Sequence, residues 1–181
     1  MKSRLFTTFF FVQLISSMEI EISITDQELR LKDDNIIVKT YKISSSKFGE
    51  GSEEGSYKTP LGKHEIREKI GQNAAIGARF IGREHFGEIY PIYFTEQIVV
   101  EEDVVQSRIL WLSGLEENIN KGEGIDSFSR YIYIHGTPEE WLLGSKASKG
   151  CIRMSNKDVI DLFDRVQIGM TVYIKKITFI L

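Results

Sequence analysis

Cys151 is the only cysteine of this 181-residue chain, and it follows His135 by 16 positions. A single thiol forms no internal disulfide, and its neighbours Lys149, Gly150 and Arg153 are poor core material. A lone cysteine is often a small buried hydrophobe. One that is flanked in this way, with a histidine at the end of an apolar run, is more typical of a nucleophile and its base. We therefore predict covalent chemistry at Cys151.

The residues around the sulfur suit a cysteine acyl transfer. Only the thiolate attacks, and the ordinary cysteine pKa of about 8.5 leaves it a minority at neutral pH. His135 can accept the proton, and the positive charges of Lys149 and Arg153 favour the anion. Gly150 lets a substrate approach the backbone closely, and the amides of Gly150 and Cys151 can hold an oxyanion.

Two elements are expected to position these groups. The aromatic and β-branched run Tyr131–Ile134 predicts a strand that delivers His135 at its end. After the cysteine motif, Ser155 and Asp158 resemble a capping box, and Gly169 ends the apolar run that follows. The apolar residues of that run recur at helical spacing: Val159, Leu162, Phe163 and Val166. A single helix therefore comes directly after the cysteine motif.

The rest of the chain predicts short strands. Glu19–Ile24 alternates apolar and charged or polar residues, and Leu29–Leu31 and Ile36–Val38 form a hairpin across the turn residues Asp33–Asn35. Further strand or buried-loop candidates are Glu65–Arg67, Ile92–Phe94, Ile98–Val100, Arg108–Leu112 and Thr171–Leu181. The chain shows no internal repeat and no long linker, so we expect one mainly β domain over residues 18–181.

Composition excludes some classes of function. Hydrophobic residues make up 41% of the chain and charged residues 27%, which is ordinary for a globular protein. A net charge of −3 lacks the excess of positive charge that is typical of nucleic-acid-binding proteins. Glu101–Asp103 is interpreted as a run of solvated charges. No spacing of histidine, cysteine and carboxylates suggests a metal site, and His64 and His85 are interpreted as structural or surface residues.

The first 17 residues resemble a secretory signal. Lys2 and Arg4 precede the uncharged apolar stretch Leu5–Ile15, which two serines follow. This predicts a signal peptide over residues 1–17 and export to the periplasm or cell envelope. The alternative is that translation begins at Met18, which would leave a cytoplasmic product.

Three motifs resemble the L,D-transpeptidase (YkuD-type) catalytic domain family. They are Thr59–Gly62, Tyr133–Thr137 and Ser148–Asn156, and the likeness covers about residues 18–174. The resemblance implies a β-sandwich-like fold with one helix after the cysteine motif, and no cofactor or metal. It also implies an acyl-enzyme made from a peptidoglycan tetrapeptide stem with release of D-alanine. The acyl group then passes to an amine on a second stem or on a wall-anchored protein.

The resemblance assigns four catalytic positions. Cys151 matches the nucleophile, and His135 matches the histidine that activates it. Gly136 matches the position next to that histidine, where the backbone or side chain helps to orient the imidazole ring. Gly150, with Cys151, matches the amides that hold the oxyanion.

Arg153, Ser148, Lys149 and Trp141 are expected to contact substrate. Arg153 matches an arginine suited to a carboxylate of the stem, and Ser148 matches the small hydroxyl residue that opens the motif. Trp141 lies between the histidine and the cysteine and can line the groove, as can Tyr57. Lys149 departs from the family, which usually has histidine there, and a lysine ammonium only donates hydrogen bonds.

Two alternatives share the same site. The acyl-enzyme can be resolved by water, which would make the protein a hydrolase of the same stems, either an L,D-carboxypeptidase or an amidase. Alternatively, Lys149 in place of histidine impairs turnover and leaves a catalytically impaired wall-binding domain.

Overall fold

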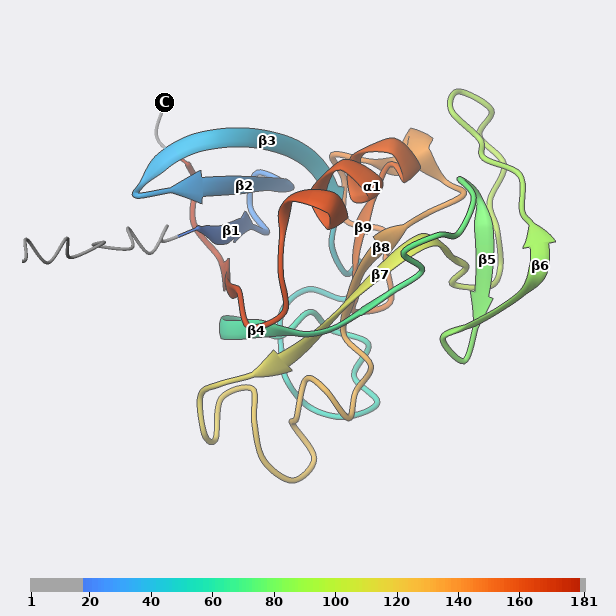
Figure 1. The fold of residues 1–181 in the computed structure, drawn as a ribbon. Coiled ribbons are helices and arrows are strands. Elements are labelled where there is room, and N and C mark those ends of the chain that lie inside the picture. The colour runs from blue at the N-terminus through green and yellow to red at the C-terminus, as the bar shows by residue number, and fades with distance from the viewer. Residues whose placement is uncertain (1–17, 180–181) are drawn as a thin grey trace, which may run out of the picture.

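Strands dominate residues 18–179, the part of the chain that this computed structural model describes (Figure 1). The predicted signal segment, residues 1–17, lies outside the described residues. The strands are β1 (Glu19–Ser23), β2 (Glu28–Asp33), β3 (Ile36–Ser44), β4 (Gly62–Ile70), β5 (Ala78–Ile81), β6 (Glu84–Ile89), β7 (Val105–Gly114), β8 (Tyr133–Gly136), β9 (Ile152–Met154) and β10 (Thr171–Lys175). The helices are the 3₁₀ turn η1 (Glu140–Leu142) and α1 (Asn156–Arg165).

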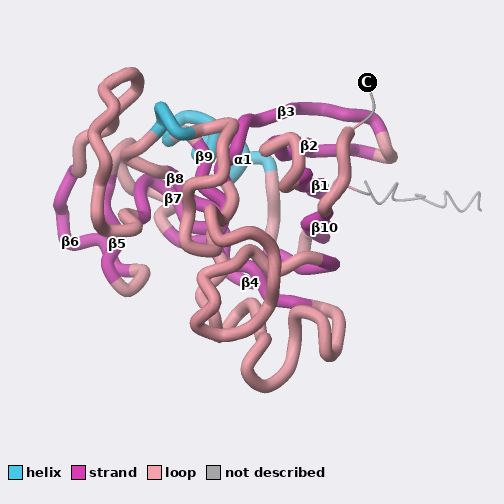
Figure 2. Tube along the Cα trace, turned by 180° about the vertical axis from the view of Figure 1, so that it is seen from behind, coloured by secondary structure: helices cyan, strands magenta, loops and turns pink. Residues whose placement is uncertain are grey.

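The strands form one sheet that closes on itself. Their order is β4-β10-β1-β2-β3-β9-β8-β7-β5-β6, and β4 also pairs with β7. The strands from β4 round to β7 therefore make a ring, and closure removes unpaired edges from that ring. The β5–β6 hairpin projects from β7 as a separate arm, at the right of Figure 1 and at the left of Figure 2. This barrel- and sandwich-like architecture confirms the mainly β prediction.

The first hairpin forms as predicted. β2 and β3 pair antiparallel, and Asp34 and Asn35 connect them with φ of 47° and 68°. Left-handed conformations at both central residues give the turn the twist that matches two antiparallel strands. Aspartate and asparagine tolerate that conformation better than most residues, which is why the turn falls where the sequence predicts it.

The helix also forms as predicted. The Ser155 side chain accepts a hydrogen bond of 3.0 Å from the Asp158 amide, as an N-cap does. Val159, Leu162 and Phe163 are buried on the face that packs toward β7 and β8. The helix ends at Arg165, before the predicted stop at Gly169. Across residues 18–179, no helix is both long and apolar enough to cross a membrane.

Three strand predictions need correction. β8 begins at Tyr133 and includes His135, because Tyr131 adopts a left-handed conformation with φ of 58°. The predicted strands or buried loops at Ile92–Phe94 and Ile98–Val100 are wrong. No strand forms there, and Phe94, Ile98 and Val99 are exposed. β7 is already paired with β8 and β4 or β5, so these apolar runs find no free edge beside it.

The barrel wall separates two apolar clusters. Along β7, Leu110 and Leu112 point into the main core, whereas Ile109 and Trp111 belong to a smaller cluster with Tyr133. This alternation follows from the two-residue period of a strand. Cys151 packs against the smaller cluster. The cysteine therefore lies on the outer face of the wall, on the same side as the β5–β6 arm.

Candidate active site

The sheet brings His135 and Cys151 together on one face. β8 and β9 are parallel neighbours, and His135 lies opposite Arg153. Cys151 comes two residues before Arg153, so its side chain shares that face. The spacing of strands and residues puts the two Cα atoms about 8 Å apart. Cys151 is partly exposed, so the residue on this face beside the histidine is open to solvent.

The backbone fixes which nitrogen of His135 can accept a proton. His135 Nδ1 lies 2.8 Å from the Gly136 carbonyl oxygen, which can only accept. Nδ1 therefore carries the proton, and Nε2 keeps a lone pair. Nε2 is buried and has no hydrogen-bond partner among residues 18–179. The ring thus presents an unused proton acceptor, and the catalytic roles of His135 and Gly136 stay predictions.

Gly136 is required by close packing. A Cβ at this position would lie 2.5 Å from Asn156 Oδ1 and 2.8 Å from the Gln106 carbonyl oxygen. The Asn156 side chain also donates to the Thr137 carbonyl oxygen at 2.9 Å. Asn156 is fully buried, so it holds the turn that follows the histidine. Sequence reasoning included Asn156 in a motif without giving it this positioning role.

The thiol of Cys151 is held by backbone groups. It donates to the Tyr131 carbonyl oxygen at 3.3 Å and accepts from the Tyr133 amide at 3.4 Å. Because Tyr131 O is only an acceptor, the sulfur carries its proton in this arrangement. The thiol does not donate to His135, so transfer of its proton to the imidazole requires the hydrogen bond to Tyr131 to break.

Electrostatics keep both partners neutral. Desolvation, reinforced by the charge of Asp103, raises the pKa of the Cys151 thiol to about 12, although Arg153 and Arg130 act to lower it. Burial lowers the pKa of His135, and the nearby Asp103 opposes that shift. The sequence predicted that basic neighbours favour the thiolate. The structure instead has a thiol beside a neutral imidazole, because desolvation outweighs the arginines.

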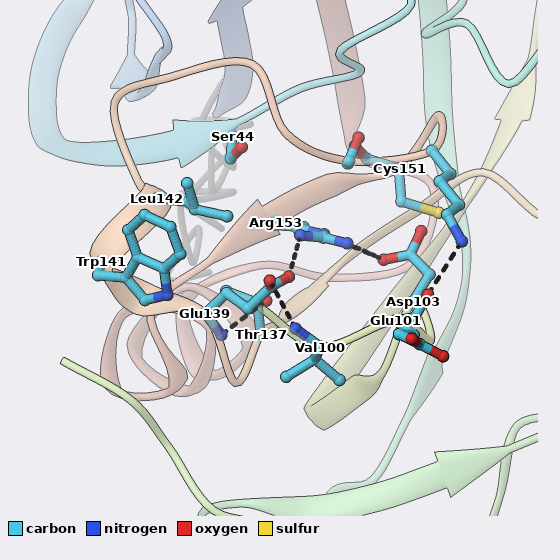
Figure 3. A network of polar contacts seen from close by, with 12 residues as sticks. Ser44, Val100, Glu101, Asp103, Thr137, Glu139, Trp141, Leu142, Cys151 and Arg153 are labelled. Atoms are coloured by element: carbon cyan, nitrogen blue, oxygen red, sulfur yellow. Dashed lines mark hydrogen bonds and ion pairs between the residues drawn. The ribbon is translucent and has the colours of Figure 1, made fainter. Parts of the chain in front are cut away.

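Arg153 lies in a buried network of ion pairs (Figure 3). Its side chain is 5% exposed, with Nε 3.0 Å from Asp103 Oδ1 and Nη1 2.8 Å from Glu139 Oε2. The other Glu139 oxygen accepts from the Val100 amide at 3.0 Å. Interpreting Glu101–Asp103 as solvated charges is therefore wrong for Asp103, whose side chain is only 23% exposed. Charge patterning could not show which acid of the run turns inward.

Hydrogen bonds hold the turn before the cysteine. Ser148 is fully buried, and its hydroxyl donates to the Cys151 carbonyl oxygen at 2.6 Å and accepts from the Gly150 amide at 3.2 Å. Thr59 donates to the Gly150 carbonyl oxygen at 2.9 Å. Gly150 has φ of 125°, which other residues rarely adopt. The structure thus engages the Gly150 amide within the turn, and its oxyanion role stays a prediction.

Lys149 and Trp141 both hydrogen-bond to the segment that connects β6 and β7. Lys149 is exposed, and its Nζ donates to the Glu101 carbonyl oxygen at 3.2 Å. It lines two cavities, of about 390 and 170 Å³. Trp141, on η1, donates through Nε1 to the Ile98 carbonyl oxygen at 3.2 Å. Both side chains therefore help to hold the irregular segment between β6 and β7.

The remaining histidines have structural surroundings. His64 is buried, with Nδ1 3.1 Å from the Gly62 carbonyl oxygen and Nε2 3.0 Å from Ser127 Oγ. His85 is exposed on β6. Within the described part of the chain, no group of histidine, cysteine and acidic residues is arranged to hold a metal ion.

Comparison with known proteins points to one family. The model of the L,D-transpeptidase catalytic domain (YkuD) matches residues 17–174. The YkuD protein of Bacillus subtilis (strain 168) is 49% identical over 51 residues, which are 28% of this chain and 31% of that protein. This chain thus matches less than two thirds of that relative's length.

Solved structures share the fold at low identity. An L,D-transpeptidase from Mycobacterium smegmatis has a TM-score of 0.52 and 15% identity, covering 88% of this chain and 59% of that one. L,D-transpeptidase 3 from Mycobacterium tuberculosis, solved with a faropenem-derived adduct, has a TM-score of 0.52 and 16% identity, covering 88% and 60%. LdtMt1, solved with imipenem, has a TM-score of 0.53 and 16% identity, covering 88% and 59%. These likenesses establish the fold.

Proposed function

The chain belongs to the L,D-transpeptidase catalytic domain family, and from that premise we propose that it is a cysteine acyltransferase of peptidoglycan. Its donor is a tetrapeptide stem that loses D-alanine. Its acceptor is an amine on a second stem or on a wall-anchored protein. The reaction uses only side chains and backbone groups of this chain, with no cofactor.

The first half-reaction forms a thioester. Cys151 passes its proton to His135 Nε2 as the sulfur attacks the carbonyl carbon of the donor. Because both groups start neutral, the proton moves during the attack rather than before it. The C–N bond of the tetrahedral oxyanion then breaks, and the D-alanine amine takes the proton from the imidazolium.

The second half-reaction regenerates the free thiol of Cys151. The acceptor amine attacks the thioester carbonyl and gives a proton to His135 Nε2. The C–S bond breaks, a new amide forms, and the thiolate regains its proton from the imidazolium. Proton and charge therefore balance over the cycle, and His135 serves alternately as base and acid.

One observation carries this proposal. His135 has its Nδ1 proton held by the Gly136 carbonyl, while Nε2 is buried, without a partner, on the sheet face that also carries Cys151. A merely structural histidine uses both nitrogens, as His64 does. An unused acceptor near a partly exposed thiol supports general-base activation of that thiol.

Product masses test the reaction. The full chain is incubated with a disaccharide-tetrapeptide, and we expect free D-alanine and cross-linked dimers that Cys151→Ala does not produce. Shortened monomers without dimers would indicate the hydrolase instead. If folded protein gives neither product while Cys151→Ala binds sacculi as well as the natural chain, the non-catalytic wall-binding alternative holds.

A carbapenem tests the nucleophile separately from the acceptor. LdtMt1 was solved with imipenem, so we expect imipenem to add its mass covalently to this chain at Cys151. Peptide mapping locates the adduct, and Cys151→Ala provides the control. A folded protein that stays unmodified would contradict the cysteine acyl-enzyme.

We also propose that the protein is exported. The pattern of residues 1–17 supports this, and the expected location is the periplasm or cell envelope. Cell fractionation with N-terminal sequencing tests it. A cytosolic product that begins at Met18 would contradict export.

A further inference from the structure

The substrate of the proposed reaction carries carboxylates, and Arg153 is already occupied. Both sides of its guanidinium are paired, with Asp103 and with Glu139, and the Glu139 side chain is only 4% exposed. A substrate carboxylate at Arg153 would have to displace one of these acids, leaving it buried without its partner. A different cation is therefore better placed to meet the substrate.

A smaller cavity is lined by residues that lie close to Cys151 in the structure. Its volume is about 170 Å³, and its lining includes Tyr57, Arg130, Tyr131 and Lys149. The thiol of Cys151 donates to the carbonyl oxygen of Tyr131 at 3.3 Å, and the charge of Arg130 acts on the thiol, so two of the lining residues lie near the sulfur. Tyr57 and Tyr131 are 56% and 51% exposed, which leaves their phenol groups accessible to a ligand.

The two cations of this cavity keep their charge. Arg130 donates to the carbonyl oxygens of Gly51 at 3.3 Å and Lys58 at 2.9 Å. Lys149 Nζ donates to the carbonyl oxygen of Glu101. In the described part of the chain, no carboxylate lies within 4.0 Å of either cation. Neutral carbonyls orient a guanidinium without cancelling its charge.

The acids near this cavity do not form ion pairs with Arg130, whereas Asp103 and Glu139 do so with Arg153. Glu54 is part of the lining, and Glu53 and Glu54 act on Arg130 only through longer-range attraction. Both glutamates are exposed, and water and salt screen exposed charges strongly. The cavity therefore combines a held guanidinium, a lysine and two accessible phenols.

We propose that this cavity binds a carboxylate of the donor stem, with Arg130 and Lys149 as its charged partners. The inference rests on the proposed function and names how that site recognises its substrate. The carboxylate of the D-alanine that leaves is separated from the scissile carbonyl carbon by three bonds, a few ångströms. A carboxylate elsewhere on the stem would satisfy the same chemistry. Lys149, where the family usually has histidine, adds a permanent charge to this cavity.

Alkylation of Cys151 tests the cavity without relying on transpeptidation. Iodoacetate and iodoacetamide have nearly the same shape, and only iodoacetate carries a carboxylate. The ratio of their rates cancels the thiolate fraction, because both reagents attack the same thiolate. We expect Arg130→Gln to lower the iodoacetate-to-iodoacetamide ratio about tenfold, and Lys149→Gln about threefold.

Matched variants control this experiment. Arg130→Lys keeps the charge and should preserve most of the ratio, and Lys149→Gln changes a side chain that is exposed. Lys146 lines the larger cavity only, so Lys146→Gln should leave the ratio unchanged. A ratio that Arg130→Gln and Lys149→Gln do not alter would overturn the proposal.

Amidated donors identify the carboxylate. A tetrapeptide ending in D-alaninamide should react about tenfold more slowly in kcat/KM if the leaving residue is bound, and Arg130→Gln should remove that preference. The same result with a donor amidated elsewhere on the stem would assign the cavity to that group. No preference with either donor would overturn the proposal. If no donor reacts at all, the proposed function fails, while the alkylation ratio still decides the charge of the cavity.

Discussion

Two arginines act on Cys151, and their surroundings differ. Arg153 is buried and paired with two carboxylates, whereas Arg130 is held by two carbonyls beside an open cavity. Both lower the pKa of the thiol. An arginine that forms ion pairs with buried carboxylates positions those side chains. An arginine without a carboxylate partner, beside an open cavity, can bind a ligand. The buried side, with His135, Asp103 and Glu139, is therefore distinct from the open side around Arg130 and Lys149.

The largest expected effect concerns the base on the buried side. His135→Gln removes the proton acceptor and should lower the rate of Cys151 acylation by imipenem about 10²–10⁴-fold. Stopped incubations followed by intact mass give this rate. His85→Gln changes an exposed histidine and should leave it unaltered. Equal rates for the natural chain and His135→Gln would remove the base from the mechanism.

Stability should separate the two arginines. Arg153→Met leaves Asp103 and Glu139 without their partner and should lower the free energy of unfolding by about 3–5 kcal/mol. Arg130→Met loses hydrogen bonds to two carbonyls and should cost about 1–3 kcal/mol. Urea denaturation measures both. Similar losses for the two variants would mean that the buried and open sides do not differ in the way described.

The pH dependence of stability tests whether buried histidines are neutral. Burial lowers the pKa of His64 to about 4 and also lowers that of His135. The unfolded chain then binds more protons than the folded one between about pH 6.5 and 4, so stability falls as the pH falls through that window. For His64 the loss is about 3 kcal/mol.

The control for this prediction is His64→Gln, which can keep hydrogen bonds to Gly62 and Ser127. The difference between the natural chain and this variant, measured by urea denaturation at pH 7.5 and 4.5, isolates His64 from all other groups. The pH dependence that remains includes His135. Parallel stability curves for the two proteins would show that His64 is not held neutral.

The smallest effect concerns the charge that opposes thiolate formation. Asp103 raises the pKa of Cys151, so Asp103→Asn should lower it and increase iodoacetamide alkylation at pH 8 about threefold to tenfold. The pH–rate profile should move toward lower pH. Glu102 is an exposed neighbour, and Glu102→Gln should not move the profile. An unchanged pH–rate profile in Asp103→Asn would show that the charge of Asp103 does not raise the pKa of the Cys151 thiol.

Local patterns predicted much of the scaffold. Ser155 as N-cap and the apolar spacing of Val159, Leu162 and Phe163 predicted α1, because a helix is stabilised by contacts three and four residues apart. The turn at Asp34 and Asn35 predicted the first hairpin in the same way. The strand prediction at Ile98–Val100 was wrong, because an apolar run forms a strand only beside the free edge of another strand. The local sequence does not show whether such an edge is present.

Sequence by itself singled out Cys151 and His135 as the candidate nucleophile and base and predicted the strand and helix beside them, because each depends on residue type and short spacing. The tertiary structure alone decided that Asp103 pairs with Arg153, that desolvation keeps Cys151 protonated, and that Arg130 lines a cavity together with Tyr131. These depend on distances between residues 20 to 50 positions apart in the chain, and on how much water each group loses when the barrel closes.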